Sequence, residues 1–304
     1  MILAPLRGVT IRCFRETFAE EIRAAGFTEA ITPFVTAISG YDPLKDRELR
    51  EQGTGNWEQG LKVTPQFIGK DSVALRDCLE KIKAAGYETA DLNCGCPFPM
   101  VRNKGRGSGI LRTPDVLRRM LEVGCETMGA GKFSIKARLG VDRTDELLKL
   151  MPMINEFPLR FLTVHARTAR QMYGGSCEVE KLREVEKVAK VPIVINGDIP
   201  FPVTERPSTT QPLNCSTPQP LNPSTSRLMI GRSFVRWLGS RGDGGELLNR
   251  YIAASQAELC GDRPVLGRMK ELIAYWKDLP QWRSRWSVIK ICRTVDELKH
   301  CVGR

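Results

Sequence analysis

Short β-branched and apolar segments alternate with helical patterns along most of the chain, and this alternation constrains the fold more than any other feature. Parallel strands need a crossover connection, which a helix commonly supplies, so the alternation is typical of βα units. The segments that we expect to form strands are 1–6, 28–34, 62–68, 88–93, 133–138, 160–165, 191–196 and 227–231. The clearest helical patterns lie at 10–25, 71–86, 114–128, 144–155 and 177–189.

Eight strands with intervening helices predict a (β/α)8 TIM barrel, which we expect over residues 1–242. A doubly wound sheet is the alternative fold, but the glycine pattern GxGxxG that commonly follows its first strand is missing here. Strand patterns end after the eighth segment, and helical patterns continue through 243–304. The sequence therefore predicts an α/β barrel followed by a C-terminal helical domain.

One segment of the barrel, residues 200–226, departs from the repeat. It is rich in Pro, Ser, Thr, Gln and Asn and repeats the phrase QPLN, so it offers little apolar surface to bury. We expect a disordered, low-complexity insert at the place where the helix between strands seven and eight belongs.

Composition narrows the function classes. The 46 Lys and Arg against 35 Asp and Glu give a net charge of +11, which suits a polyanionic partner such as nucleic acid. Ten cysteines without regular spacing and two histidines favour reduced cytoplasmic thiols and no metal site. The apolar runs are shorter than the roughly 20 residues of a membrane span, so we expect a cytoplasmic protein with no membrane partner.

The expected carboxyl ends of the strands carry polar groups or glycines at nearly every position. In a TIM barrel these ends form the catalytic face. A single polar residue at a strand end is more often solvated than functional, but the whole set favours a site. Its members are Ala4, Pro5 and Leu6, then Gln66, Asn93, Lys136, Arg138, His165, Arg167, Asn196, Gly197, Asp198, Gly231 and Arg232.

The last residues of this set suit a phosphate group. Gly197 and Gly231 let backbone N–H groups approach closely, and Arg232 can bind phosphate oxygens through two donors. Gln66 and Asn93 can hydrogen-bond the edge of a flavin ring, and Lys136 can balance the negative charge of a reduced flavin. These residue types at these strand ends favour FMN as the cofactor.

Cys96 lies in a glycine-bearing loop after the fourth strand, where its thiol would face the barrel mouth. Most cysteines are small buried hydrophobic residues. A thiol with a pKa of about 8.5 is nevertheless protonated at neutral pH and can serve as a general acid. The basic turn that follows, with Arg102, Lys104 and Arg106, is either a solvated loop or a mobile lid that contacts RNA phosphate.

The stretch LNCGCP at 92–97, with Val101 and then Gly107 and Ser108, resembles the signature of the tRNA-dihydrouridine synthase family. Further matching phrases occur in the family's order: LAPLRGVT (3–10), PQFIG (65–69), SIKARLG (134–140), VHART (164–168), INGD (195–198) and MIGR (229–232). The resemblance covers 1–199 and 227–304.

This resemblance implies an FMN-binding barrel and a helical tRNA-binding domain. It also implies NADPH-driven reduction of the C5–C6 bond of a uridine in the tRNA D-loop, with hydride passing to C6 and a proton passing from Cys96 to C5. The matching positions imply FMN contacts from Pro5, Gln66, Lys136, His165, Asn196, Asp198, Gly231 and Arg232. The motif CGCP and the segment ITPFV at 31–35 resemble the subfamily that modifies position 16 of the D-loop more than the other subfamilies.

The C-terminal part adds candidate RNA contacts. Residues 268–276 resemble the helix that grips tRNA in that subfamily, so we expect Arg268, Lys270, Arg283 and Arg285 to bind substrate together with Arg138 and Arg167 at the mouth. Trp276, Trp282 and Trp286 either stack on bases or form the core of a small bundle.

Two alternatives stay open: an FMN-dependent barrel oxidoreductase that acts on a free pyrimidine, and a degenerate, non-catalytic tRNA-binding relative. A monomer is expected in each case.

Overall fold

The computed structural model describes residues 1–49, 57–58, 60–201 and 227–302. Within them the strands are β1 (Ile2–Leu3), β2 (Glu29–Ile31), β3 (Val35–Thr36), β4 (Trp57–Glu58), β5 (Leu61–Thr64), β6 (Gln66–Ile68), β7 (Ala90–Cys94), β8 (Phe133–Gly140), β9 (Leu162–Thr168), β10 (Ile193–Asn196) and β11 (Arg227–Ile230). The α-helices are α1 (Arg12–Thr17), α2 (Ala19–Ala24), α3 (Ser72–Ala84), α4 (Pro99–Arg102), α5 (Pro114–Met128), α6 (Glu146–Ile154), α7 (Val179–Val188), α8 (Arg232–Ser240), α9 (Gly244–Glu258), α10 (Asp262–Ile273), α11 (Pro280–Ile289) and α12 (Val295–Val302).

The strands form one sheet that closes on itself. Its order is β3-β6-β7-β8-β9-β10-β11-β1-β2-β5-β4, parallel except for the β4–β5 pair. The two ends of this order belong to the same stretches of chain, because β2 continues into β3 and β5 continues into β6 across Pro65. At this junction Thr32 N donates to Thr64 O (3.0 Å) and Gln66 N donates to Thr32 Oγ1 (3.0 Å).

The expected TIM barrel is therefore confirmed. β2 with β3 and β5 with β6 each fill one strand position, and β1 and β7 to β11 fill the other six of the eight. All eight expected strand segments overlap observed strands, and the expected helix at 10–25 is divided into α1 and α2 at Phe18. The predicted insert at 200–226 lies outside the described residues except for Pro200 and Phe201.

The barrel interior is divided between apolar and polar side chains. Ile2, Ala4, Ile31, Phe161, Val194 and Met229 form a small buried apolar cluster. Strand pairing places the inward positions of neighbouring strands side by side, and on β2 and β5 to β8 several of these positions hold polar residues. Glu29, Thr64, Gln66, Asp91 and Ser134 are all buried there.

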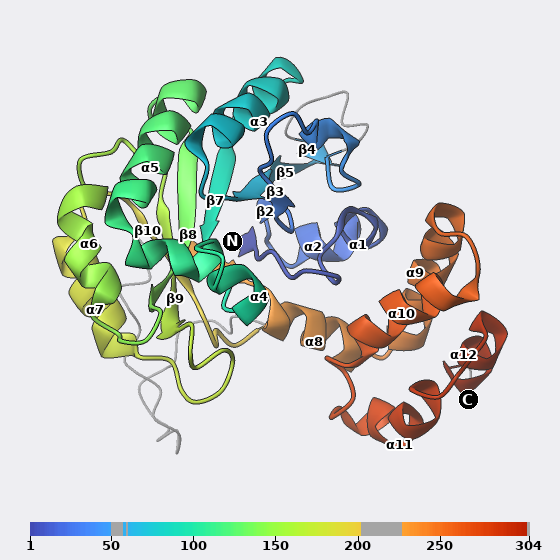
Figure 1. The fold of residues 1–304 in the computed structure, drawn as a ribbon. Coiled ribbons are helices and arrows are strands. Elements are labelled where there is room, and N and C mark those ends of the chain that lie inside the picture. The colour runs from blue at the N-terminus through green and yellow to red at the C-terminus, as the bar shows by residue number, and fades with distance from the viewer. Residues whose placement is uncertain (50–56, 59, 202–226, 303–304) are drawn as a thin grey trace.

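Helices α3, α5, α6 and α7 cover the outside of the sheet (Figure 1). Their apolar faces pack on the outward side chains of β7 to β9 in one large cluster, which includes Leu79, Leu121, Leu92 and Val164. None of the helices in the described ranges is long and apolar enough to cross a membrane.

Helices α9 to α12 lie beside α1, α2 and α8, away from α6 and α7 (Figure 1). They share one apolar cluster with the barrel, in which Phe14 and Phe18 of the α1 region meet Tyr251 of α9 at ring-centroid distances of 6.0 and 5.5 Å. The expected C-terminal helices are therefore present, and they share their core with the barrel helices. Removing residues 243–304 would expose this core to water.

Two of the three C-terminal tryptophans belong to that core. Trp276 and Trp282 are 0% and 1% exposed, and their Nε1 atoms donate to Val235 O (2.6 Å) and Gly239 O (2.8 Å). Stacking on RNA bases is therefore the wrong interpretation for these two rings. Trp286 is half-buried beside them.

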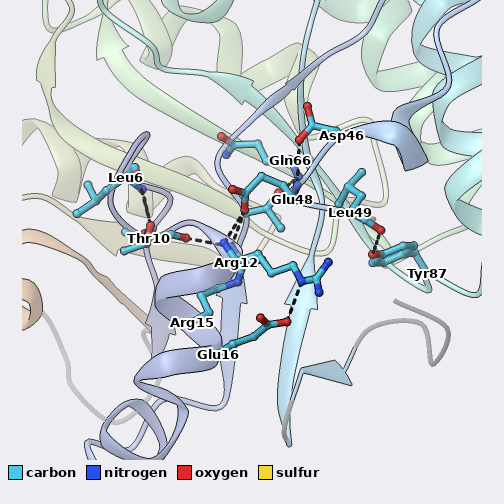
Figure 2. A network of polar contacts seen from close by, with 12 residues as sticks. Leu6, Thr10, Arg12, Arg15, Glu16, Asp46, Glu48, Leu49, Gln66 and Tyr87 are labelled. Atoms are coloured by element: carbon cyan, nitrogen blue, oxygen red, sulfur yellow. Dashed lines mark hydrogen bonds and ion pairs between the residues drawn. The ribbon is translucent and has the colours of Figure 1, made fainter. Parts of the chain in front are cut away.

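A buried arginine ties α1 to the segment after β3 (Figure 2). Arg15 is 1% exposed, and its Nη1 donates to Thr10 O (3.0 Å) and to Glu48 Oε2 (2.8 Å). Arg12 N also donates to Glu48 Oε2 (3.1 Å). Because Thr10 closes the loop after β1, this network holds the first loop at the carboxyl ends of the strands in place.

At the opposite, amino-terminal end of the barrel, Glu29 is 2% exposed and accepts hydrogen bonds from Thr64 Oγ1 (2.9 Å), Arg160 Nη2 (2.9 Å) and Arg227 Nη2 (2.9 Å). Burial alone would raise the pKa of Glu29, but the hydrogen bonds from Arg160 and Thr64 and the charges of Arg160 and Arg227 hold this pKa below its usual value.

We expect Glu29→Gln to lower the free energy of unfolding by about 2–3 kcal/mol at pH 7, because two arginines lose their buried counter-charge. A lowered carboxyl pKa stabilises the fold above the unfolded-state value of 4.5 and loses this effect as the pH falls further. Urea denaturation should therefore show the gap between wild type and variant closing in acid. The exposed Glu20→Gln is the control, and a gap that is constant with pH would contradict the assignment.

Candidate functional site

The sheet register brings the predicted strand-end residues together. Asn93 of β7 pairs with Lys136 of β8, and Arg138 pairs with His165 of β9. His165 in turn pairs with Asn196 of β10. Residues paired across parallel strands face the same side of the sheet, so these five side chains lie on neighbouring inward positions at the carboxyl ends of the strands.

Cys96 follows β7 in a loop, and both its backbone N–H and its backbone carbonyl are hydrogen-bonded. Asn93 Oδ1 accepts hydrogen bonds from Gly95 N (3.1 Å) and Cys96 N (2.8 Å). Cys96 O accepts hydrogen bonds from Ser108 N (3.1 Å) and Ser108 Oγ (2.9 Å). Gly107 has φ +57°, and a Cβ there would lie 2.8 Å from Cys96 Cβ, so only glycine fits. The backbone that carries the thiol is thus held in place.

The environment of Cys96 keeps its thiol protonated. The residue is 8% exposed, and burial raises its pKa, while a hydrogen bond from the backbone of Phe98 and the charges of Arg7, Arg138 and Lys136 act in the opposite direction. The raised pKa leaves the thiol in its acid form through neutral pH, as a proton donor requires.

Two of these cations, Lys136 and Arg138, come from strand β8. Lys136 is half-buried, and burial and the charge of Arg138 lower its pKa to about 8. Arg138 is 2% exposed, and its guanidinium donates to Gly95 O (3.0 Å), Thr168 O (2.9 Å) and Met172 O (2.6 Å). Arg138 therefore braces the Cys96 loop against the loop after β9, while Lys136 faces the mouth.

His165 and Arg167 form the next part of the site. Burial and the charges of Lys136 and Arg138 lower the pKa of His165, so its ring is neutral at physiological pH. Arg167 Nη1 lies 3.3 Å from His165 Nε2 and donates to Asp198 Oδ1 (3.0 Å). A Cβ on Gly197 would lie 2.7 Å from Cys177 Sγ, so the INGD turn packs directly on this sulfur.

Gly231 and Arg232 begin helix α8 beside the loop after β1. A Cβ on Gly231 would lie 2.9 Å from Ala4 Cβ and 3.4 Å from Leu6 Cδ1. Thr10 Oγ1 accepts a hydrogen bond from Leu6 N (2.7 Å) and donates one to Ala4 O (2.9 Å), which shapes this loop around Pro5. No side chain in the described part of the chain caps the start of α8, so the first N–H groups of this helix can face an anion.

Tyr173 is a site residue that the sequence did not reveal. Its ring carries Arg232 at 3.7 Å on one side and lies 5.3 Å from the Arg138 guanidinium, with the His165 ring at 6.3 Å. The preceding Met172 has φ +53°, which turns the loop after β9 toward the mouth. The sequence prediction considered residues at the ends of strands, and Tyr173 comes from the middle of a loop.

The predicted substrate-binding residues fall into three groups. Arg138 and Arg167 lie inside the mouth, as described above. Arg102, Lys104 and Arg106 lie in and after α4, and the Nε atoms of Arg102 and Arg106 are buried without a hydrogen-bond partner among the described residues. On the C-terminal helices, Arg268 pairs with Glu258, while Lys270, Arg283 and Arg285 donate to Cys292 O, Asp278 O and Val302 O.

The residues at the mouth fit a flavin phosphate and ring. The uncapped start of α8, the bare Gly231 backbone and Arg232 offer donors for a dianion. The half-buried Lys136 and the neutral His165 lie deeper, and the buried Thr163 Oγ1 beside Lys136 has no hydrogen-bond partner among the described residues. In the described ranges no group of three His, Cys, Asp or Glu side chains is arranged to hold a metal.

Lys136 is held in a place that disfavours its charge, so Lys136→Met should stabilise the fold at pH 7 by about 1–3 kcal/mol. A lysine pKa lowered to about 8 makes the wild type gain stability as the pH rises from 8 toward the usual 10.5, so the advantage of the variant should shrink over this range. Chemical denaturation at pH 7 and pH 10 measures both values, with the exposed Lys149→Met as the control. A variant less stable than wild type at pH 7 would overturn this reading of the site.

Comparison with known proteins agrees with the site. The family model described as dihydrouridine synthase (Dus) matches residues 2–207. tRNA-dihydrouridine synthase B of Vibrio vulnificus (strain CMCP6) is 26% identical over 203 residues, which cover 66% of this chain and 61% of that protein. The Pseudomonas aeruginosa protein of the same name is 28% identical over 208 residues, covering 68% of this chain and 60% of that one. The match thus spans about three fifths of each relative's length.

Among solved structures, the one described as "Crystal structure of TcOYE with pHBA" superposes with a TM-score of 0.51 at 11% identity. The match covers 92% of this chain and 95% of that chain, and at this identity it speaks for the fold alone. The family match covers more than half of the chain, including the loop with Cys96 and the strand ends around it. The chain belongs to the dihydrouridine synthase family.

Proposed function

We propose that this chain is a flavin-dependent tRNA-dihydrouridine synthase, which reduces the C5–C6 double bond of a uridine in the tRNA D-loop with NADPH as the reductant. The observation that carries the proposal is the Cys96 thiol, which is kept protonated and is fixed beside Lys136 at the barrel mouth. Family membership and relatives named tRNA-dihydrouridine synthase B support the same reaction.

The cofactor assigned to this mouth is FMN. Gly231, Arg232 and the start of α8 would hold its phosphate, and Asn196, Gly197 and Asp198 flank that place. Ala4, Pro5, Leu6, Gln66, Asn93, Lys136 and His165 would surround its ring. Bound there, FMN supplies the hydride that adds to C6 of the uracil ring.

Cys96 supplies the proton in this scheme. As C6 gains hydride, C5 becomes basic and takes the proton from Sγ of Cys96, and the thiolate is reprotonated from solvent. The hydrogen bonds of Asn93 and Ser108 to the Cys96 backbone hold the sulfur still during this transfer. The Lys136 cation balances negative charge that develops at the mouth, and the neutral His165 can donate or accept a hydrogen bond.

The RNA partner is inferred from charge and position. The chain carries a net charge of +11, and Arg102, Lys104 and Arg106 follow the Cys96 loop directly. A Cβ at Gly8, in the loop after β1, would collide with the Glu271 carboxylate, so helix α10 lies against a loop of the mouth. We assign residues 243–304 to tRNA binding, with Arg268, Lys270, Arg283 and Arg285 as the candidate contacts. Residues 1–242 are assigned to catalysis, in a cytoplasmic monomer. Position 16 is the proposed target.

Cys96→Ala should retain the yellow flavin spectrum and lose dihydrouridine formation by about 10²–10⁴-fold, the usual contribution of a general acid. The assay uses the full chain reconstituted with FMN, an unmodified tRNA transcript and NADPH, with the product measured by mass spectrometry of nucleosides. Cys94→Ala is the matched control, because Cys94 is two residues away but packs in the apolar cluster under α3 and α5.

Wild-type turnover by the Cys96→Ala variant would refute the acid assignment. Reduction of free uridine as fast as that of the transcript would favour the free-pyrimidine oxidoreductase instead. A wild-type protein that does not take up FMN would leave only a non-catalytic relative.

A further inference from the structure

A carboxylate occupies the middle of β7, where the flanking residues are apolar. Asp91 is 0% exposed, as are its neighbours Ala90 and Leu92. Leu92 packs in the outer apolar cluster, so Asp91 faces the barrel interior, where it pairs in register with Gln66. A buried charge of this kind is costly unless hydrogen bonds compensate it.

Two donors satisfy the carboxylate. Gln66 Nε2 donates to Asp91 Oδ2 (2.7 Å), and Ser134 Oγ donates to Asp91 Oδ1 (2.6 Å). Burial raises the pKa of Asp91 to about 6, against the hydrogen bonds from Ser134 and Gln66 and the charge of Lys136. Asp91 is therefore an anion at neutral pH, and an anionic carboxylate can only accept hydrogen bonds.

This restriction gives the neighbouring side-chain amides a direction. Gln66 must turn its Nε2 toward Asp91, which leaves its Oε1 to accept from Asn93 Nδ2 (2.8 Å). Asn93 Oδ1 is then left to accept from the backbone N–H groups of Gly95 (3.1 Å) and Cys96 (2.8 Å). If the Asn93 amide were turned by 180°, its shape would be nearly the same, but its Nδ2 donor would face the N–H donors of Gly95 and Cys96.

We infer that Asp91 is a positioning residue for Cys96: its carboxylate orients the amides of Gln66 and Asn93, and through them it holds the backbone of the loop that presents the thiol. We call the chain Asp91–Gln66–Asn93 the amide relay. The catalytic consequence rests on the proposed function, whereas the hold on the loop does not.

The relay predicts different results from two substitutions at one position. In Asp91→Asn, the new Oδ1 can still accept from Gln66 while the new Nδ2 donates to Ser134 Oγ, so the direction of the relay survives. In Asp91→Ala, Gln66 Nε2 loses its acceptor, and the bond from Asn93 Nδ2 is the one of the two relay bonds that still orients the Gln66 amide. Core filling alone would also separate these two variants, because asparagine has the size of aspartate whereas alanine leaves a cavity. Gln66→Met distinguishes the two roles, because it nearly keeps the volume of the side chain and removes the amide that the relay needs.

The first measurement is the rate at which iodoacetamide alkylates Cys96 in the folded, FMN-free protein, followed by peptide mass spectrometry. Asp91→Ala should raise this rate about tenfold, because the loop opens locally more often. Asp91→Asn should stay within about threefold of wild type. The control is Thr127→Val, a nearly isosteric change at a buried hydroxyl of α5 that has no hydrogen-bond partner among the described residues, and it should behave as wild type.

The second measurement is turnover on the tRNA transcript. Asp91→Ala should lower kcat about 10–100-fold with KM nearly unchanged, because the acid is misplaced while the RNA surface is intact. If Asp91→Ala does not fold, Gln66→Met breaks the relay at its middle and should give the same faster alkylation.

The relay is refuted if Cys96 in Asp91→Ala, or in a folded Gln66→Met, reacts at the wild-type rate. It is equally refuted if Asp91→Asn loosens the loop as much as Asp91→Ala, or if Thr127→Val does so. A wild-type protein that forms no dihydrouridine would defeat the proposed function, but the alkylation rates would still decide the relay.

Discussion

The mouth of this barrel depends on how one buried negative charge is compensated. Asp91 cannot donate a hydrogen bond, so each side chain that touches it must present a donor. The amide of Gln66 then has one permitted direction, and so has that of Asn93. The loop with Cys96 begins where this chain of donors and acceptors ends. A carboxylate in the core is thus connected to the loop of Cys96 through two neutral side chains.

Buried charges at the two ends of the barrel affect its stability in opposite directions. Lys136 keeps a charge in a half-buried place that lowers its pKa, and Arg138 beside it is fully enclosed. At the other end of the barrel, Glu29 gathers Arg160 and Arg227 into pairs that favour its charged form. The ion pairs at the base stabilise the fold, whereas the charge of Lys136 at the mouth reduces its stability. The stabilising ion pairs and the destabilising charge thus lie at opposite ends of one barrel.

Much of the fold could be read from the sequence. The alternation of strands and helices predicted the barrel, and the parallel topology by itself brings strand ends such as Asn93, Lys136 and His165 to one face. Gly231 and Arg232 after the last strand predicted a place suited to a phosphate, and helix α8 begins there in the structure. These features depend on local pattern and topology, which a sequence carries directly.

Other features depend on register and packing between distant segments. Asp91 was visible as a carboxylate inside an apolar strand, but its partners Gln66 and Ser134 come from two other strands. Tyr173 reaches Arg232 from a loop whose course the sequence does not give. Trp276 and Trp282 looked equally suited to RNA or to a core, and the donors of both rings proved to be satisfied by α8 carbonyls.

The central claim is that this chain reduces a uridine of tRNA, and mapping of dihydrouridine in cellular tRNA tests it most directly. Mass spectrometry should compare tRNA from a host that lacks dihydrouridine synthases, carrying either this chain or its Cys96→Ala variant. We predict dihydrouridine at one D-loop position with the wild-type chain and none with the variant. The account would be contradicted if neither tRNA sample contained dihydrouridine although both proteins were present and yellow.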